Sequence, residues 1–173
     1  MPHLTLPELE AGLDEIWLSP TDQGVLEMMV RRPRSGEREV LQEGTLDLDC
    51  GLVGDCWNLP DQPDTQLNIM NARAIALIAQ TPERWPLAGD QLYLDLDLSA
   101  RNLPPGTCFS LGTAIIEVTA VPHTGCAKFT ERFGSAAARF VNSPLGRQWN
   151  LRGINAKVRQ AGVIRRGDVA KKL

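Results

Sequence analysis

Strand patterns dominate the arrangement of apolar and polar residues along this chain. In Leu92–Leu98 four leucines alternate with mostly polar residues, and this period of two predicts a strand with one buried face. Further strands are expected at Thr107–Leu111, Ala114–Val121, Gly153–Arg159, Val163–Ile164 and around Val169. Near the N-terminus, Glu15–Leu18 and Val25–Arg31 are expected to be strands on either side of a turn at Thr21–Gly24.

Helical patterns are fewer. Asn71 is a plausible N-cap for a helix over Ala72–Gln80, which is apolar on nearly all sides and therefore expected to be buried, with Pro82 as a stop signal. A second helix is expected over the alanine-rich segment Gly134–Val141, closed before Pro144. Many short strands with glycine and proline turns predict a mainly β protein, a β-barrel or closed sheet with a few peripheral helices.

Length and composition favour one domain over residues 1–173. The chain has 173 residues, of which 43% are hydrophobic and 23% charged, as in ordinary globular proteins. No apolar run approaches the roughly 20 residues that a membrane-spanning helix needs. The first ten residues are partly acidic and lack a positively charged segment followed by an apolar one, so no secretory signal is expected and the cytoplasm is the expected location.

The net charge of −3 argues against general nucleic-acid binding. Two basic clusters nevertheless occur, and their members are Arg31, Arg32 and Arg34, then Arg165, Arg166, Lys171 and Lys172. Each cluster is either a solvated surface segment or a basic wall for an anionic ligand.

The four cysteines are Cys50, Cys56, Cys108 and Cys126. A cytosolic chain of this length keeps such thiols reduced, and no two of them form a CxxC pair. A metal site built from Cys50, Cys56 and His123 is an alternative that the wide spacing disfavours. Cys50, Cys56 and Cys108 lack basic neighbours in sequence and are expected to be structural.

Cys126 has the most informative surroundings. The β-branched run Ala114–Val121 ends at Pro122, and a helix is able to begin near Ala127. A thiol at such a junction is often exposed, near a helix N-terminus and near a cation, and these conditions lower its pKa. The alternative is a small buried hydrophobe.

The energy required for an ionised Cys126 is attainable. A thiol with a pKa of about 8.5 is only a few per cent thiolate at neutral pH, and lowering the pKa by about two units takes roughly 2.7 kcal/mol. A helix N-terminus supplies about 0.3–2 kcal/mol, and a nearby cation can supply the remainder. The candidate cations are His123, Lys128 and Arg152.

Three polar residues each have a functional and a structural interpretation. His123 is suited either to proton transfer with the thiol or to capping the turn after Pro122. Asp55 is suited either to orienting a ligand or to forming a turn. Asn102 is suited either to hydrogen bonding with a heterocycle edge or to an Asx-turn.

Read together, several segments resemble the MOSC domain family, named after the C-terminal domain of molybdenum cofactor sulfurases. In order they are GLVGD at 51–55, QLNIM, GDQLYLDLDLS with RNL, LGTAIIEVT, the cysteine loop His123–Phe129, RGI and a late GD. The resemblance covers about 15–169, and the length suits a stand-alone member. It implies a closed, strongly curved, mostly antiparallel β-barrel, similar to the small barrel of pyruvate kinase.

The resemblance also implies a functional cysteine that carries or transfers sulfur, often in connection with molybdenum cofactor. The matching position is Cys126, with His123 as its catalytic partner. The residues expected to bind the cofactor are Asp55, Arg101, Asn102, Lys128 and Arg152. Two departures stand out: Cys56-Trp57 follow the aspartate where the family often has a histidine or polar residue, and Arg101 replaces a frequent glutamate.

The function expected from this resemblance is that of a sulfur carrier or transferase, or of a molybdenum-cofactor-binding protein. The expected partners are a sulfur donor such as a cysteine desulfurase, or a molybdenum enzyme. A binding module without turnover and an accessory protein for reductive detoxification of N-hydroxylated compounds are the alternatives. Pyridoxal phosphate is not expected, because it belongs to the aminotransferase-like part of the larger sulfurases; a bound metal and the oligomeric state stay open.

Overall fold

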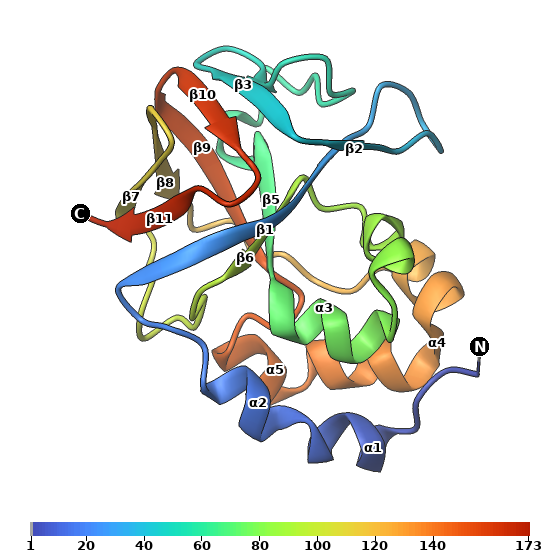
Figure 1. The fold of residues 1–173 in the computed structure, drawn as a ribbon. Coiled ribbons are helices and arrows are strands. Elements are labelled where there is room, and N and C mark those ends of the chain that lie inside the picture. The colour runs from blue at the N-terminus through green and yellow to red at the C-terminus, as the bar shows by residue number, and fades with distance from the viewer. Residues whose placement is uncertain (1) are drawn as a thin grey trace.

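A computed structural model describes residues 2–173 and shows a closed β-barrel with helices gathered on one side (Figure 1). The seven barrel strands are, in spatial order, β11 (Val169–Lys172), β7 (Cys108–Leu111), β8 (Ala114–Val118), β9 (Ile154–Gln160), β5 (Leu67–Asn71), β6 (Leu92–Asp95) and β1 (Gln23–Arg31). Pairing of β1 with β11 closes the barrel, and among these pairs only β5–β6 is parallel. The expected closed, mostly antiparallel barrel is confirmed.

Smaller elements extend this barrel. Strand β2 (Glu39–Leu41) pairs with the end of β1, and a three-stranded sheet has the order β10 (Gly162–Arg165), β3 (Glu43–Asp47) and β4 (Gly51–Leu52). The helices are α1 (Leu6–Ala11), α2 (Leu13–Trp17), α3 (Ala72–Ala79), α4 (Ala127–Asn142) and α5 (Pro144–Gln148), with 3-10 turns η1 (Pro63–Thr65) and η2 (Pro82–Ala88). In residues 2–173 no helix has both the length and the apolar character to cross a membrane.

The described residues form two hydrophobic cores, one inside the barrel and one between the barrel wall and the helices. A bulge at Glu27 in the β1–β6 pairing places Leu26 and Met29, which are three residues apart, on the same face of β1. Leu26 and Met29 belong to the barrel core, whereas Val30 belongs to the helix layer. The helices are therefore held by apolar packing on the outer wall of the barrel.

Strand β6 is buried on both faces, so the expectation of a half-buried strand is wrong. Leu92 and Leu94 point into the barrel, and the intervening Tyr93 is fully buried under the helices. The Tyr93 hydroxyl donates a hydrogen bond of 2.7 Å to the Trp85 carbonyl. An aromatic ring with one satisfied hydroxyl can be buried like a leucine.

One further expectation about elements needs correction. The strand expected at Glu15–Leu18 is instead part of helix α2 and its C-cap, where Leu13 and Ile16 are one helical turn apart and buried. The helix expected over Gly134–Val141 and the helix start expected near Ala127 are both found, because α4 consists of two helical segments that meet at Gly134, where the backbone is not helical and φ is +88°. The predicted cap of α3 is confirmed: Asn71 Oδ1 accepts a hydrogen bond of 2.9 Å from the Ala74 N–H.

Candidate functional site

Two asparagines fix the loop that carries the cysteine from β8 to α4. Asn155 on β9 donates to the carbonyls of Val121 (3.0 Å) and Pro122 (3.3 Å). Asn142, the last residue of α4, accepts a 2.9 Å hydrogen bond from the Gly125 N–H and donates a 3.0 Å bond to the Gly125 carbonyl. The loop is thus held at both ends, which sets the position of the residue that follows Gly125.

That residue is Cys126, the N-cap of α4, and it is exposed. Burial of the thiol raises its pKa, but the backbone N–H groups of Phe129 and Lys128 and the charge of Arg152 lower it by more. The net result is a pKa below that of an ordinary cysteine. Exposure, a helix N-terminus and a nearby cation are therefore all present at this sulfur.

Cys126 opens into a basic pocket of about 280 Å³. Its charged and sulfur-bearing lining residues are Arg32, Arg38, Arg132, Arg152, Lys128, Cys56 and Cys126. The remaining lining residues are Ser35, Gly36, Asn68, Ala88, Gly89 and Phe129. No carboxylate of residues 2–173 lines this pocket, so its electrostatic preference is for an anion.

Asp55 forms a buried ion pair with Arg32, one of the arginines that line the pocket. Its carboxylate is fully buried and accepts from Arg32 Nε (2.9 Å) and Nη2 (2.6 Å) in a two-point contact. Burial raises the pKa of Asp55, and the Arg32 hydrogen bonds and charge lower it by more, so the carboxyl stays ionised. The structure places Asp55 against Arg32 rather than on the pocket surface. Asp55 therefore acts on a ligand only by holding the Arg32 guanidinium in place.

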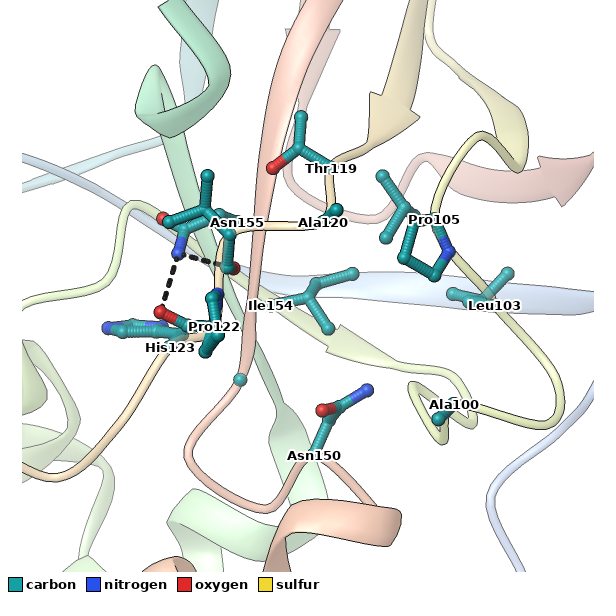
Figure 2. Close-up of a pocket in the computed structure, with 13 residues that line it drawn as sticks. Ala100, Leu103, Pro105, Thr119, Ala120, Pro122, His123, Asn150, Ile154 and Asn155 are labelled. Carbon is teal, nitrogen blue, oxygen red and sulfur yellow. Dashed lines mark hydrogen bonds between the residues drawn. The ribbon is translucent and has the colours of Figure 1, made fainter. Parts of the chain in front are cut away.

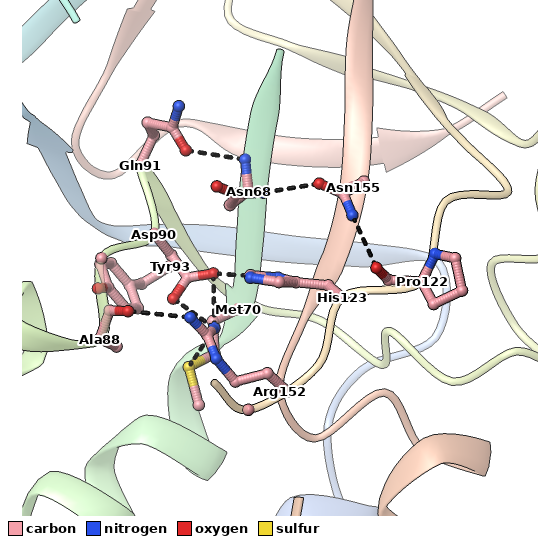
Figure 3. A network of polar contacts seen from close by, with 12 residues as sticks. Asn68, Met70, Ala88, Asp90, Gln91, Tyr93, Pro122, His123, Arg152 and Asn155 are labelled. Carbon is pink, nitrogen blue, oxygen red and sulfur yellow. Dashed lines mark hydrogen bonds and ion pairs between the residues drawn. The ribbon is translucent and has the colours of Figure 1, made fainter. Parts of the chain in front are cut away.

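Arg152 is held by a second carboxylate, Asp90, for which the sequence predicts no role. Asp90 is fully buried and accepts from Arg152 Nη1 at 2.7 and 3.0 Å, and Nη2 donates to the Ala88 carbonyl at 2.9 Å (Figure 3). The guanidinium also lies 4.9 Å from the centre of the Phe129 ring. Arg152 Nε is buried and has no hydrogen-bond partner among residues 2–173.

The other three cations are not neutralised. Arg38, Arg132 and Lys128 form no ion pair within the part of the chain that the structure describes. Burial lowers the pKa of Arg38, and the nearby charges of Arg132 and Arg32 lower it further. An anion in the pocket would relieve this repulsion.

His123 lies next to this network but outside the cysteine pocket. Its Nδ1 is 3.5 Å from Asp90 Oδ1 (Figure 3). Its side chain borders two other pockets, one of which is drawn in Figure 2. Burial lowers the pKa of His123 to about 4, although Asp90 raises it. The imidazole is therefore neutral at neutral pH, and Arg152 rather than His123 is the cation that acts on Cys126.

Arg101 and Asn102 are placed elsewhere. They line a pocket of about 390 Å³ with Trp17 and Trp149, and no residue of this pocket lines the one at Cys126. Asn102 Nδ2 donates to the carbonyls of Thr21 and Asp97 at 2.9 and 2.8 Å, which fixes the local loop. The structure thus does not bring Arg101 and Asn102 together with Cys126, Lys128 and Arg152.

Several pocket residues are not found by reasoning from the sequence. Arg32 belongs to the first basic cluster, and the interpretation as a basic wall holds for it, whereas Arg31 is paired with Glu39 at 2.6 Å. Arg38 and Arg132 have no local signal, Asp90 is part of the GDQLYLDLDLS segment without a predicted role, and Cys56, expected to be structural, is exposed and lines the pocket. They come from separate segments, and only the fold brings them to one place.

A second hollow continues from the first. It measures about 450 Å³ and shares Arg32, Cys56 and Asn68 with the cysteine pocket, and Trp57, Asn58 and Gln62 are among its other lining residues. Cys56 therefore stands where the two hollows meet. Residues 2–173 contain no group of three or more His, Cys, Asp or Glu side chains placed to hold a metal ion.

The fold and site define a closed barrel with an exposed cysteine at a basic rim, and solved structures of this fold exist. YuaD from Bacillus subtilis matches 87% of this chain and 95% of its own with a TM-score of 0.64 at 14% identity. YiiM from Escherichia coli matches 86% of this chain and 69% of its own, with a TM-score of 0.58 and 21% identity. YiiM from Geobacillus stearothermophilus matches 88% of this chain and 73% of its own, with a TM-score of 0.55 and 14% identity.

YuaD and YiiM are MOSC-family proteins, so the fold of this chain is of the MOSC type. No family model and no curated protein sequence matches the chain. At these identities the likeness concerns the fold alone.

Proposed function

We propose that this protein is a MOSC-family sulfur carrier in which Cys126 acts as a thiolate and holds transferred sulfur as a persulfide. The observation that carries the proposal is the exposed Cys126 thiol at the N-terminus of α4, in a pocket with five basic side chains. A thiolate is the nucleophilic form of cysteine, and these surroundings favour it.

The reaction needs no group beyond this thiolate and a donor. The Cys126 thiolate attacks the outer sulfur of a donor persulfide, such as that of a cysteine desulfurase. A new S–S bond forms on Cys126, and the donor leaves as its own thiolate. The N–H groups of Lys128 and Phe129 and the Arg152 charge that favour the Cys126 thiolate also favour the persulfide anion.

The same residues fit molybdenum cofactor as a ligand. Arg38, Arg132 and Lys128 offer unpaired cations for a phosphate group, and the buried Arg152 Nε is an unused donor. The pocket of about 280 Å³ alone is small for such a ligand, but the adjoining hollow at Trp57 extends it. When bound, the cofactor would supply the metal centre that accepts sulfur.

His123 has a positioning role in this proposal. Its neutral ring stands against Asp90, which in turn holds Arg152 next to Cys126. A molybdenum enzyme is the proposed acceptor of the sulfur, and the cytoplasm is the proposed place of the transfer.

Sulfur loading tests the proposal directly. The protein is incubated with a persulfide donor, and mass spectrometry of its peptides is compared with and without thiol alkylation. The test is made in the Cys56→Ser background, because Cys56 is a second exposed thiol of the same pocket. In that background we expect one added sulfur atom on Cys126, none when Cys126→Ser is added, and normal loading in the matched control Cys108→Ser, whose cysteine is half-buried on β7.

Equal loading with and without Cys126→Ser in this background would refute the proposal. Absence of loading in Cys56→Ser would refute it as well. If the pocket still bound inorganic phosphate in that case, a binding module without turnover would be the better description.

A further inference from the structure

Cys56 is the second thiol of the cysteine pocket. Of the four cysteines, only Cys56 and Cys126 are exposed, and both line the same pocket. They are far apart in sequence and come from different elements, Cys56 from the segment between β4 and η1 and Cys126 from the start of α4. The fold alone brings them together.

The surroundings of Cys56 are as basic as those of Cys126. Its backbone N–H donates to the Arg32 carbonyl at 2.6 Å, and Arg32 and Arg38 line the same pocket. Cys56 lies close enough to both of these guanidiniums to interact with them electrostatically.

The other two cysteines lack these features. Burial raises the pKa of Cys50, and the neighbouring carboxylates of Asp47 and Asp49 raise it further. Cys108 is half-buried, with its sulfur 3.9 Å from the Gly106 carbonyl. Neither lines the pocket at Cys126.

We propose that Cys56 is a second reacting thiol, which attacks adducts on Cys126 and closes an intramolecular Cys56–Cys126 disulfide. This inference deepens the proposed function and, for sulfur as the adduct, rests on it. A disulfide needs a Cα separation of about 4.4–6.8 Å. Cys56 lies in an irregular segment rather than in a strand, and this segment is the part of the backbone that would move to close the bond.

The chemistry balances as follows. The Cys56 thiolate attacks Cys126 Sγ of the persulfide, the Cys56–Cys126 bond forms, and the bond to the outer sulfur breaks. The outer sulfur leaves with the electron pair as hydrosulfide, so it is reduced by two electrons while the two cysteines are oxidised by two. An external dithiol reduces the disulfide by exchange and restores both thiols.

The test uses an adduct other than sulfur, so that it does not depend on sulfur transfer. Dithiobis(nitrobenzoate) is added to the full chain with Cys50 and Cys108 replaced by Ser. Attack by Cys126 releases one thionitrobenzoate, and attack by Cys56 on the mixed disulfide releases a second. We expect two equivalents, no retained adduct, and a linked Cys56–Cys126 peptide by mass spectrometry.

The matched variant is Cys56→Ser in the same background. It should release one equivalent and retain the mixed disulfide on Cys126. In the parent protein the rate constant of the second release should be independent of protein concentration, because the attack is intramolecular.

Retention of an adduct on each of the two cysteines, or a second release whose rate constant rises with protein concentration, would overturn the inference. A disulfide that forms in a protein whose Cys126 accepts no sulfur would refute the proposed function alone. Sulfur loading without a disulfide would refute only the role of Cys56.

Discussion

At the scale of single residues, two buried carboxylates decide how much positive charge the pocket presents. Asp55 holds Arg32 and Asp90 holds Arg152, each by a two-atom contact. These pairs fix the direction of two guanidiniums and offset part of their charge. Most of the net positive potential of the pocket therefore comes from the unpaired cations, while Arg152 still acts on Cys126 from a fixed position.

His123 makes the stability of the protein depend on pH. Its pKa is lowered from 6.5 to about 4, so between these values the unfolded chain binds more protons than the folded protein does. The contribution of this residue to stability is complete above pH 6.5 and falls as the pH drops towards 4. We expect a loss of about 2 kcal/mol between about pH 7.5 and about pH 5 from this residue.

Urea unfolding of the wild type and of His123→Gln at both pH values measures this contribution. The variant should lack this part of the loss, since a glutamine does not titrate. An identical loss in both proteins would show that the imidazole titrates normally.

At the scale of elements, the site depends on connections between elements more than on the elements themselves. Helix α4 supplies both Cys126 at its beginning and Asn142, which fixes the preceding loop, at its end. Strand β9 supplies Asn155 for the same loop, and the turn before β9 supplies Arg152. A change in this turn is therefore expected to act on the site as well as on stability.

Gly153, directly after Arg152, tests that turn. Its φ is +111°, and a Cβ there would lie 2.4 Å from the Ile69 carbonyl oxygen. Gly153→Ala should lower the free energy of unfolding by roughly 1–3 kcal/mol for the strained backbone conformation, and by a further amount for the clash with the Ile69 carbonyl. The matched control is Gly36→Ala, with φ of +89° and nothing within 4 Å of its Cβ.

Denaturant unfolding gives both free energies. In Gly36→Ala the free energy of unfolding should fall only by the cost of the strained backbone. In Gly153→Ala it should fall clearly further. Equal losses would mean that the close approach of Gly153 to β5 carries no energetic weight.

At the scale of the whole molecule, a net charge of −3 coexists with a pocket that favours anions. At physiological ionic strength charges are screened over about 8 Å, so the pocket potential is local and the acidic remainder of the surface contributes little. The seven-stranded barrel and the helix layer bring four arginines from three separate segments to this place.

Charge selectivity in alkylation measures this local potential. The ratio of the rates at which iodoacetate and iodoacetamide modify Cys126 should fall about threefold to tenfold in Arg38→Gln or Arg132→Gln at low salt. Arg166→Gln is the control, because Arg166 is exposed in the turn between β10 and β11 and lines none of the pockets described above.

Added salt should lower the ratio in the wild type towards that of the two pocket variants. A ratio that neither salt nor these substitutions change would exclude an electrostatic preference for anions at Cys126.

The sequence by itself predicts features that depend on neighbours along the chain. Alternating and β-branched runs locate most barrel strands, Asn71 locates the start of α3, and the junction after Pro122 locates an exposed thiol at a helix N-terminus. Sequence patterns fail at Glu15–Leu18 and at Tyr93, where packing against distant elements outweighs the local pattern.

Only the tertiary structure decided which side chains share the site. Cys56, Arg38 and Arg132 line the same pocket as Cys126. His123 lies outside this pocket in a buried contact with Asp90, and Arg101 and Asn102 line another pocket. Local periodicity reports which face of an element is apolar, but the proximity of distant residues follows from strand register and barrel closure, which no short stretch of sequence specifies.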